Sequence, residues 1–154
     1  MSSYQQIHYQ IVFSTKYRRA TLSAPHSQSL YQYIGGVARN CKAQLLRVNG
    51  IEDHIHIFSS LPPVLSLADY VKTVKVSSSI WMKESGLFPL FEGWQEGYGA
   101  FTYSVEHANR IIEYIKNQRE HHKSESFEDE YRRLLKENNV IYDERYLFER
   151  PPMG

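Results

Sequence analysis

Two histidines stand two residues apart in the segment EDHIHIF, at positions 52–58. The apolar neighbours favour a β-strand, in which side chains at i and i+2 point to the same face. His54 and His56 therefore project together, whereas Ile55 and Ile57 point to the opposite face. Two imidazoles at this spacing can bind one metal ion from one side and leave other coordination positions free. Histidines also form hydrogen bonds at sheet surfaces, so the metal interpretation needs a third ligand from elsewhere.

That third ligand must be a carboxylate, another histidine or an amide, because Cys41 is the single cysteine. The segment 106–122, EHANRIIEYIKNQREHH, has helical periodicity, and Tyr114 lies about 120° from the centre of its apolar stripe. The stripe consists of Val105, Ala108, Ile111, Ile112 and Ile115. Gln118 follows Tyr114 by four residues and shares its face. A phenol with a pKa near 10 can attack only with help from a cation, which the metal or Arg110 could supply.

Around these residues the periodicity predicts the element order β-α-β-β-α-β-α-α. The strands are expected at 7–14, at two places within 43–61 and at 99–105, and the helices at 23–42, 66–85, 105–123 and 127–138. Alternating apolar residues indicate that the strand at 7–14 is half-buried. The dipeptide Asn49-Gly50 predicts the turn between the second and third strands. The order matches the ferredoxin-like pattern, an α+β fold with an antiparallel sheet, helices on one face and additional C-terminal helices.

The helices expected at 66–85 and 127–138 have recognisable starts. Ser66 with Asp69, and Ser126 with Asp129, have the spacing of a serine cap and an acidic residue three positions later. The helix at 105–123 is expected to be the most regular of the chain.

Length and composition indicate one domain, residues 1–149, followed by a frayed tail at 150–154. We expect no membrane segment and no signal peptide, because the apolar runs are short and the N-terminus lacks a basic region. A single cysteine excludes an internal disulfide and fits a reduced, cytoplasmic setting. The formal net charge of +1 excludes a protein that coats nucleic acid by bulk electrostatics.

A nucleic-acid partner would therefore have to be held by local patches. The basic candidates for phosphate contacts are Lys16, Arg18 and Arg19 in one segment, and Lys72, Lys75 and Lys83 on the second helix. Each could equally belong to a solvated face. The loop at 91–99 could stack an unpaired base through its aromatic residues, or it could close the core. Three histidines near the tyrosine could assist proton transfer, namely His107, His121 and His122.

Together these segments resemble a known family. His54-Ile55-His56 resembles the HUH motif, in which a bulky apolar residue separates two histidines, and Tyr114-x-x-x-Gln118 resembles the tyrosine motif of single-tyrosine HUH transposases. Three further segments resemble the insertion-sequence 200/605 family: GWQEGYGAF at 93–101, YIKNQREHHK at 114–123 and DERYLF at 143–148. The resemblance extends from the first strand to about Phe148.

The resemblance implies a ferredoxin-like (RRM-like) fold and a metal-dependent transposase that cleaves and rejoins single-stranded DNA. His54, His56 and Gln118 would bind Mg²⁺ or Mn²⁺, and Tyr114 would form a 5′-phosphotyrosine. It also implies a homodimer that recognises a DNA hairpin at the ends of the element, with Tyr114 serving either its own or the partner subunit's histidine pair. Two alternatives stay open: a domesticated nuclease that processes repeated hairpins by the same chemistry, and a non-catalytic RRM-like binding module.

Overall fold

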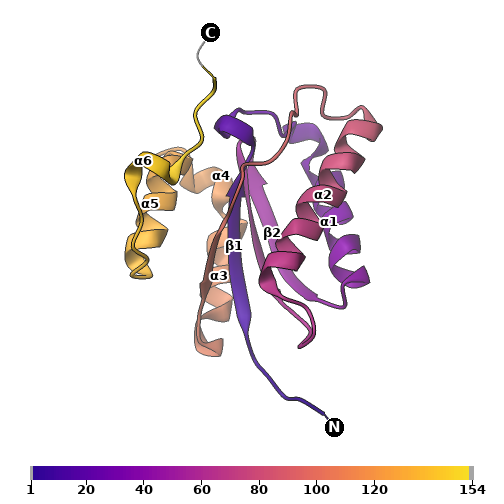
Figure 1. Ribbon diagram of the computed structural model, residues 1–154, viewed down its shortest axis with the longest axis vertical. Helices are drawn as coiled ribbons and strands as arrows, with labels where there is room; N and C mark the ends of the chain where they lie inside the picture. Colours follow the sequence, from indigo (N-terminus) through magenta and orange to yellow (C-terminus); the bar gives the residue numbers. More distant parts are fainter. Residues whose placement is uncertain (1, 153–154) are drawn as a thin grey trace.

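The computed structural model describes residues 2–152, which fold around a four-stranded antiparallel sheet (Figure 1). The strands are β1 (His8–Ser14), β2 (Gln44–Ile51), β3 (His54–Ser60) and β4 (Gly99–Thr102). Their order across the sheet is β2-β3-β1-β4, and every neighbouring pair is antiparallel. The predicted ferredoxin-like α+β class is confirmed.

Helices cover both faces of this sheet. Helices α1 (Ser27–Asn40) and α2 (Leu67–Ser85) lie on one face. The opposite face carries α3 (Ala108–Lys116), α4 (Gln118–His121), α5 (Phe127–Glu137) and α6 (Glu144–Leu147), seen at the left of Figure 1. The sequence predicted C-terminal helices beyond the ferredoxin-like unit, and the structure shows that they form a second layer. Among residues 2–152, none of the helices has the length and hydrophobicity that a membrane span requires.

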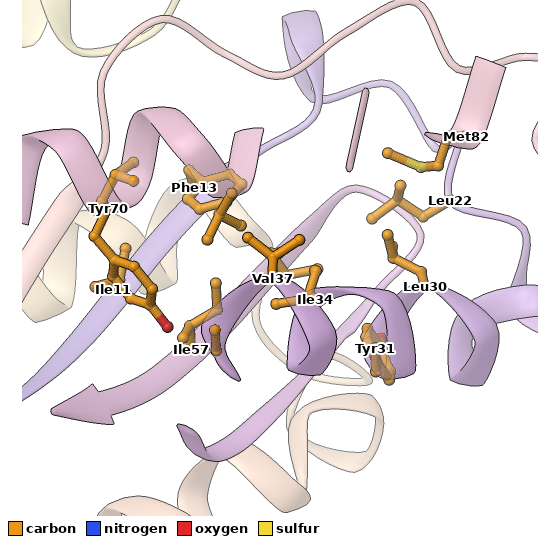
Figure 2. Packing of buried hydrophobic residues seen from close by; sticks show 14 of the residues in the cluster. Ile11, Phe13, Leu22, Leu30, Tyr31, Ile34, Val37, Ile57, Tyr70 and Met82 are labelled. Atoms are coloured by element: carbon orange, nitrogen blue, oxygen red, sulfur yellow. The ribbon is translucent and has the colours of Figure 1, made fainter. Parts of the chain in front are cut away.

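The main core lies between the sheet and helices α1 and α2 (Figure 2). Ile11 and Phe13 of β1, together with Ile55 and Ile57 of β3, are buried there against residues such as Ile34 of α1. Burial of such apolar side chains is the main source of stability in a domain of this size. Since the isoleucines of β3 face this core, the histidines face the other side of the sheet, as predicted. The second helical layer on that side was not predicted.

The opposite face of the sheet is equally covered. Val12 of β1 packs with Leu134 of α5, and Phe58 of β3 packs with Ile111 and Ile115 of α3. The prediction that the strand at 7–14 is half-buried is therefore wrong, because the C-terminal helices remove its second face from water.

The predicted hairpin turn is also wrong. Asn49 and Gly50 lie inside β2, and the turn to β3 falls at residues 52–53. Gly50 is needed for close approach, because a Cβ at this position would lie 2.1 Å from the carbonyl oxygen of His54. The Asn49 side-chain amide donates hydrogen bonds to the carbonyls of Ile115 (2.9 Å) and Lys116 (3.0 Å) at the end of α3. Both residues thus serve tertiary contacts instead of a turn.

The helix expected at 105–123 is interrupted. It begins with a 3₁₀ turn at Val105–His107, continues as α3 and breaks at Asn117 before α4. The break comes directly after Ile115 and Lys116, whose carbonyls accept from Asn49. The side chain of this β2 residue therefore caps the end of α3. The predicted serine caps are confirmed, because Ser66 and Ser126 each accept a hydrogen bond from the backbone N–H three residues later.

Candidate active site

The two strand histidines are fully buried beneath α3, α4 and α5. Their rings lie 5.1 Å apart between centroids. The Nδ1–H of His54 donates to the Asp53 carboxylate at 2.7 Å, and its Nε2 lies 3.0 Å from Oε1 of Gln118. On His56, Nδ1 lies 3.1 Å from the side-chain amide nitrogen of Gln10. The Nε2 atoms of both rings therefore point into the space beneath the C-terminal helices.

A carboxylate from α5 fills that space. Oε1 of Glu130 lies 3.1 Å from Nε2 of His54, 3.1 Å from Nε2 of His56 and 2.9 Å from Nε2 of His122. Its Oε2 accepts from the side-chain amide of Gln118 at 3.1 Å. Glu130 has no exposed surface, so its charge must be balanced by buried partners such as these.

The tyrosine hydroxyl joins the same cluster. Tyr114 donates to Oε2 of Glu130 and accepts from the guanidinium of Arg133 at 2.7 Å. Its ring lies 5.9 Å from that of His56. Arg133 is held in turn by the Glu125 carboxylate at 3.0 Å. The structure thus brings Tyr114 and the histidine pair of one chain together, with an acceptor and a cation on either side of the hydroxyl.

The charges of the site follow from its burial and its partners. Burial lowers the pKa of His54, but the Asp53 and Glu130 carboxylates outweigh it and raise this pKa to about 9. Burial holds the pKa of His56 below its ordinary value. Burial raises the pKa of Glu130, but the surrounding imidazoles outweigh burial and hold it well below its usual range. Glu130 is therefore a buried carboxylate beside a protonated His54.

Burial and the adjacent Glu130 carboxylate raise the pKa of Tyr114 well above its ordinary value, although Arg133 acts in the other direction. The hydroxyl is thus protonated in this arrangement. Any attack by its oxygen requires a base for the proton and a cation for the charge that develops.

The donor atoms fit a divalent ion. Ligands around one ion with bonds of about 2.1 Å lie roughly 3 Å apart. Nε2 of His54 lies at such distances from Oε1 of Gln118 (3.0 Å) and from Oε1 of Glu130 (3.1 Å). Nitrogen and oxygen donors of this kind suit several divalent metals. Of the predicted ligands, the structure brings His54, His56 and Gln118 to one place.

Three residues of this cluster were not predicted in these roles: Glu130, Arg133 and, as a group facing the histidine pair, His122. One signal for Glu130 is present in the sequence. On α5 the apolar residues Phe127, Tyr131 and Leu134 form one buried face, and Glu130 interrupts it. A buried carboxylate in an apolar stripe requires a partner, and this points to a polar site.

The first group of predicted DNA contacts lies at the turn after β1. Arg18 donates to the carbonyl of Glu149, and Arg19 pairs with Glu92 at 2.5 Å. Lys16 is partly exposed, with its ammonium 5.4 Å from the Tyr17 ring. Arg18 is therefore engaged within the protein, whereas the ends of Lys16 and Arg19 lie near the surface.

The second group lies on α2. Lys72 is exposed. Lys75 donates to backbone carbonyls in the 95–97 segment, and burial lowers its pKa to about 8 although Glu149 and Glu96 oppose this change. Lys75 thus ties the loop after α2 to the helix.

That loop packs into the protein. Trp94 contacts the rings of Phe13 and Phe91 at 5.0 and 5.1 Å between centroids, and its indole N–H donates to Ser78 at 3.0 Å. Of the two interpretations for residues 91–99, the structure favours closure of the core for Trp94 and Phe91.

Comparison with known sequences identifies one family of relatives. The family model described as "Transposase IS200 like" matches residues 3–118. The transposase for insertion sequence element IS200 of Salmonella typhimurium is 28% identical over 120 residues, which cover 75% of this chain and 78% of that protein. The ISDra2 transposase TnpA of Deinococcus radiodurans is 25% identical over 122 residues, covering 73% and 84%. The matched family segment ends at Gln118, before His122 and Glu130.

Two solved structures share the fold. A candidate transposase of Deinococcus radiodurans has a TM-score of 0.61 at 24% identity, covering 77% of this chain and 95% of that one. A REP-associated tyrosine transposase bound to a REP hairpin has a TM-score of 0.59 at 18% identity, covering 79% and 74%.

Proposed function

This chain belongs to the family of IS200-like transposases, and from this premise we propose that it cleaves and rejoins single-stranded DNA through a covalent phosphotyrosine on Tyr114. One observation carries the proposal. The Tyr114 hydroxyl donates to Glu130, which itself contacts His54 and His56, and accepts from Arg133 on its other side. A tyrosine used only for packing needs neither an acceptor nor a cation at its oxygen.

The residues have distinct tasks in the proposed reaction. The Tyr114 oxygen attacks a backbone phosphorus, and the bond from phosphorus to the 3′ oxygen breaks, which leaves a 5′-phosphotyrosine and a free 3′-hydroxyl. Oε2 of Glu130 accepts the hydrogen bond from Tyr114 and is placed to take its proton. The guanidinium of Arg133 faces the same oxygen and stabilises negative charge on it. Attack by a 3′-hydroxyl on the phosphotyrosine reverses the step and rejoins a strand.

We propose that a divalent ion, Mg²⁺ or Mn²⁺, is held by His54, His56 and Gln118. When bound, it would withdraw charge from a phosphoryl oxygen and orient the phosphate. Gln118 lies within reach of His54 and donates to Glu130, so the same contacts that would hold the ion also fix the start of α4.

The proposed substrate is single-stranded DNA with a hairpin at the ends of an insertion element. Support comes from the REP hairpin bound to a structural neighbour of this chain. The proposed phosphate contacts are Lys16, Arg18, Arg19, Lys72 and Lys75, and we propose a homodimer of a single domain formed by residues 1–149. Of the tail at 150–154, residues 153–154 lie outside the described part of the chain.

A second candidate is a domesticated enzyme that processes repeated hairpins by the same chemistry, which the same neighbour favours. A non-catalytic RRM-like binding module has less support. Such modules bind bases on sheet aromatics, whereas in this chain the corresponding face is covered by α3 and α5 around a charged cluster.

The test is a denaturing-gel assay with labelled single-stranded DNA from the flanks of the gene, in Mn²⁺ or in EDTA. We expect an SDS-stable protein–DNA adduct that requires the metal and is absent in Tyr114→Phe. The matched control is Tyr146→Phe, because Tyr146 is 78% exposed and outside the cluster. Persistence of the adduct in Tyr114→Phe, or tight DNA binding with no adduct in any condition, would refute the proposed chemistry.

A further inference from the structure

Five side chains converge at one buried point, which is more than the three ligands proposed above. Oε1 of Glu130 contacts Nε2 of His54, His56 and His122 at 2.9–3.1 Å. Oε1 of Gln118 lies 3.0 Å from Nε2 of His54 and 3.1 Å from Nε2 of His122. The side chain of His122 is only 3% exposed, so it belongs to the interior of the cluster.

The outer nitrogens of two histidines already have partners. Nδ1–H of His54 donates to the Asp53 carboxylate at 2.7 Å, and Nδ1–H of His122 donates to the Glu125 carbonyl at 2.6 Å. A histidine that binds a metal usually donates its second N–H to a carboxylate or a carbonyl, which fixes the ring and presents the other nitrogen. His54 and His122 both show this arrangement, although they come from a strand and from the end of α4.

Two arrangements can hold imidazole nitrogens about 3 Å from carboxylate or amide oxygens. Either the nitrogens carry protons and donate hydrogen bonds, or a cation lies between the nitrogens and the oxygens. His54, His122 and Glu130 offer one donor atom each within 4.8 Å of one another. We infer that His122 and Glu130 are ligands of the divalent ion in this chain, together with the histidine pair, so that the metal site extends beyond the two strand histidines and Gln118. This inference rests on the metal dependence of the proposed function.

The donor set determines the class of metal. Three imidazoles, one carboxylate and one amide favour a transition metal over Mg²⁺, because Mg²⁺ prefers oxygen ligands and retains its water. Among transition metals, affinity rises from Mn²⁺ to Co²⁺. We therefore expect the purified chain to bind Mn²⁺ and Co²⁺ much more tightly than Mg²⁺.

A rival interpretation makes the opposite prediction. Glu130 could serve only as the counter-charge of the protonated histidines and be displaced when a metal enters. In that case removal of its charge would ease metal entry, and Glu130→Gln would bind metal at least as tightly as the parent chain.

The experiment measures binding of Mn²⁺ by calorimetry and of Co²⁺ by its visible absorption, on the full chain freed of metal with EDTA. We expect Glu130→Gln and His122→Asn each to weaken binding tenfold or more and to change the Co²⁺ spectrum. The matched control is His26→Asn. His26 lies immediately before α1, outside the cluster, with its ring 6.2 Å from that of Phe88, so its loss should leave the Co²⁺ spectrum unchanged.

Circular dichroism of each variant shows whether it folds. If Glu130→Gln does not fold, Glu130→Asp, which keeps the charge, replaces it. Unchanged or tighter metal binding in folded Glu130→Gln and His122→Asn would overturn the inference. That result together with a metal-dependent adduct in the parent chain would leave the proposed function intact. Metal binding as expected with no adduct would instead refute the proposed function alone.

Discussion

Gly50→Ala is the substitution whose effect can be worked out most fully from the structure. Gly50 lies in β2 opposite Ile55, beside the start of β3. An added Cβ would lie 2.1 Å from the carbonyl oxygen of His54 and 2.8 Å from Cα of Ile55, whereas such contacts essentially never fall below 3.0 Å. Both neighbours are backbone atoms, so no side chain can rotate away. Because the shortest contact would be 2.1 Å and the limit is 3.0 Å, the two strands must separate by at least 0.9 Å.

Forcing extra volume into a packed interior typically costs about 1–3 kcal/mol, and we expect the upper end here because the backbone itself must move. A loss of about 3 kcal/mol corresponds to a fall in Tm of roughly 6–12 °C for a chain of this size. The strand that moves carries His54, and a displacement of about 1 Å in a catalytic group can lower a rate about a hundredfold. Adduct formation should therefore fall further than the stability change alone would explain.

Thermal and urea unfolding, followed by circular dichroism, measure the first effect, and the denaturing-gel assay measures the second. Gly36→Ala is the matched control. Gly36 lies inside α1, and the nearest atom to an added Cβ is a flexible Arg39 guanidinium nitrogen at 3.9 Å, so this variant should gain about 0.5–1 kcal/mol. A Gly50→Ala protein that unfolds at the same temperature as the parent chain would show that the close approach of β2 and β3 is not required.

Three further predictions concern the contacts that hold the site. Asn49→Ala removes two hydrogen bonds to the end of α3 and should cost about 1–3 kcal/mol; unfolding measurements check this, and slower adduct formation would reflect a looser Tyr114. Ser126→Ala removes the cap of α5 and should cost about 1 kcal/mol, whereas Ser126→Asp should restore it; equal stability of the two variants would contradict the cap. Because the folded pKa of Lys75 is lowered to about 8, the unfolded chain binds more protons above that pH, so stability should rise between pH 8 and 9.5. Urea unfolding across this window should show a smaller rise in Lys75→Gln, and an identical rise would exclude Lys75 as its source.

Much of the local structure could be read from the sequence. The strand that carries His54 and His56, the direction of the intervening isoleucines and the serine caps of two helices all follow from short-range periodicity. The order of elements was sufficient for the ferredoxin-like sheet. Spacing alone also predicted that Tyr114 and Gln118 lie on one side of their segment. Although the break at Asn117 places them in α3 and α4, both side chains contact Glu130.

Other features depended on contacts between distant segments. Asn49-Gly50 has the local signature of a turn. In the fold, however, the Asn49 side-chain amide caps α3, and the absence of a side chain at Gly50 allows β3 to approach closely. The capped end of α3 then interrupts a segment with regular helical periodicity.

The partners of the acidic residue of the cluster likewise could not be predicted. Glu130 meets His56 across 74 residues of sequence, and no local pattern specifies that pairing. The sequence by itself determined which groups could do chemistry and which faces they occupy, because side-chain direction follows from backbone periodicity. Only the tertiary structure decided which of them meet, because a second helical layer buries the charges of the site and each buried charge must then find its partner there.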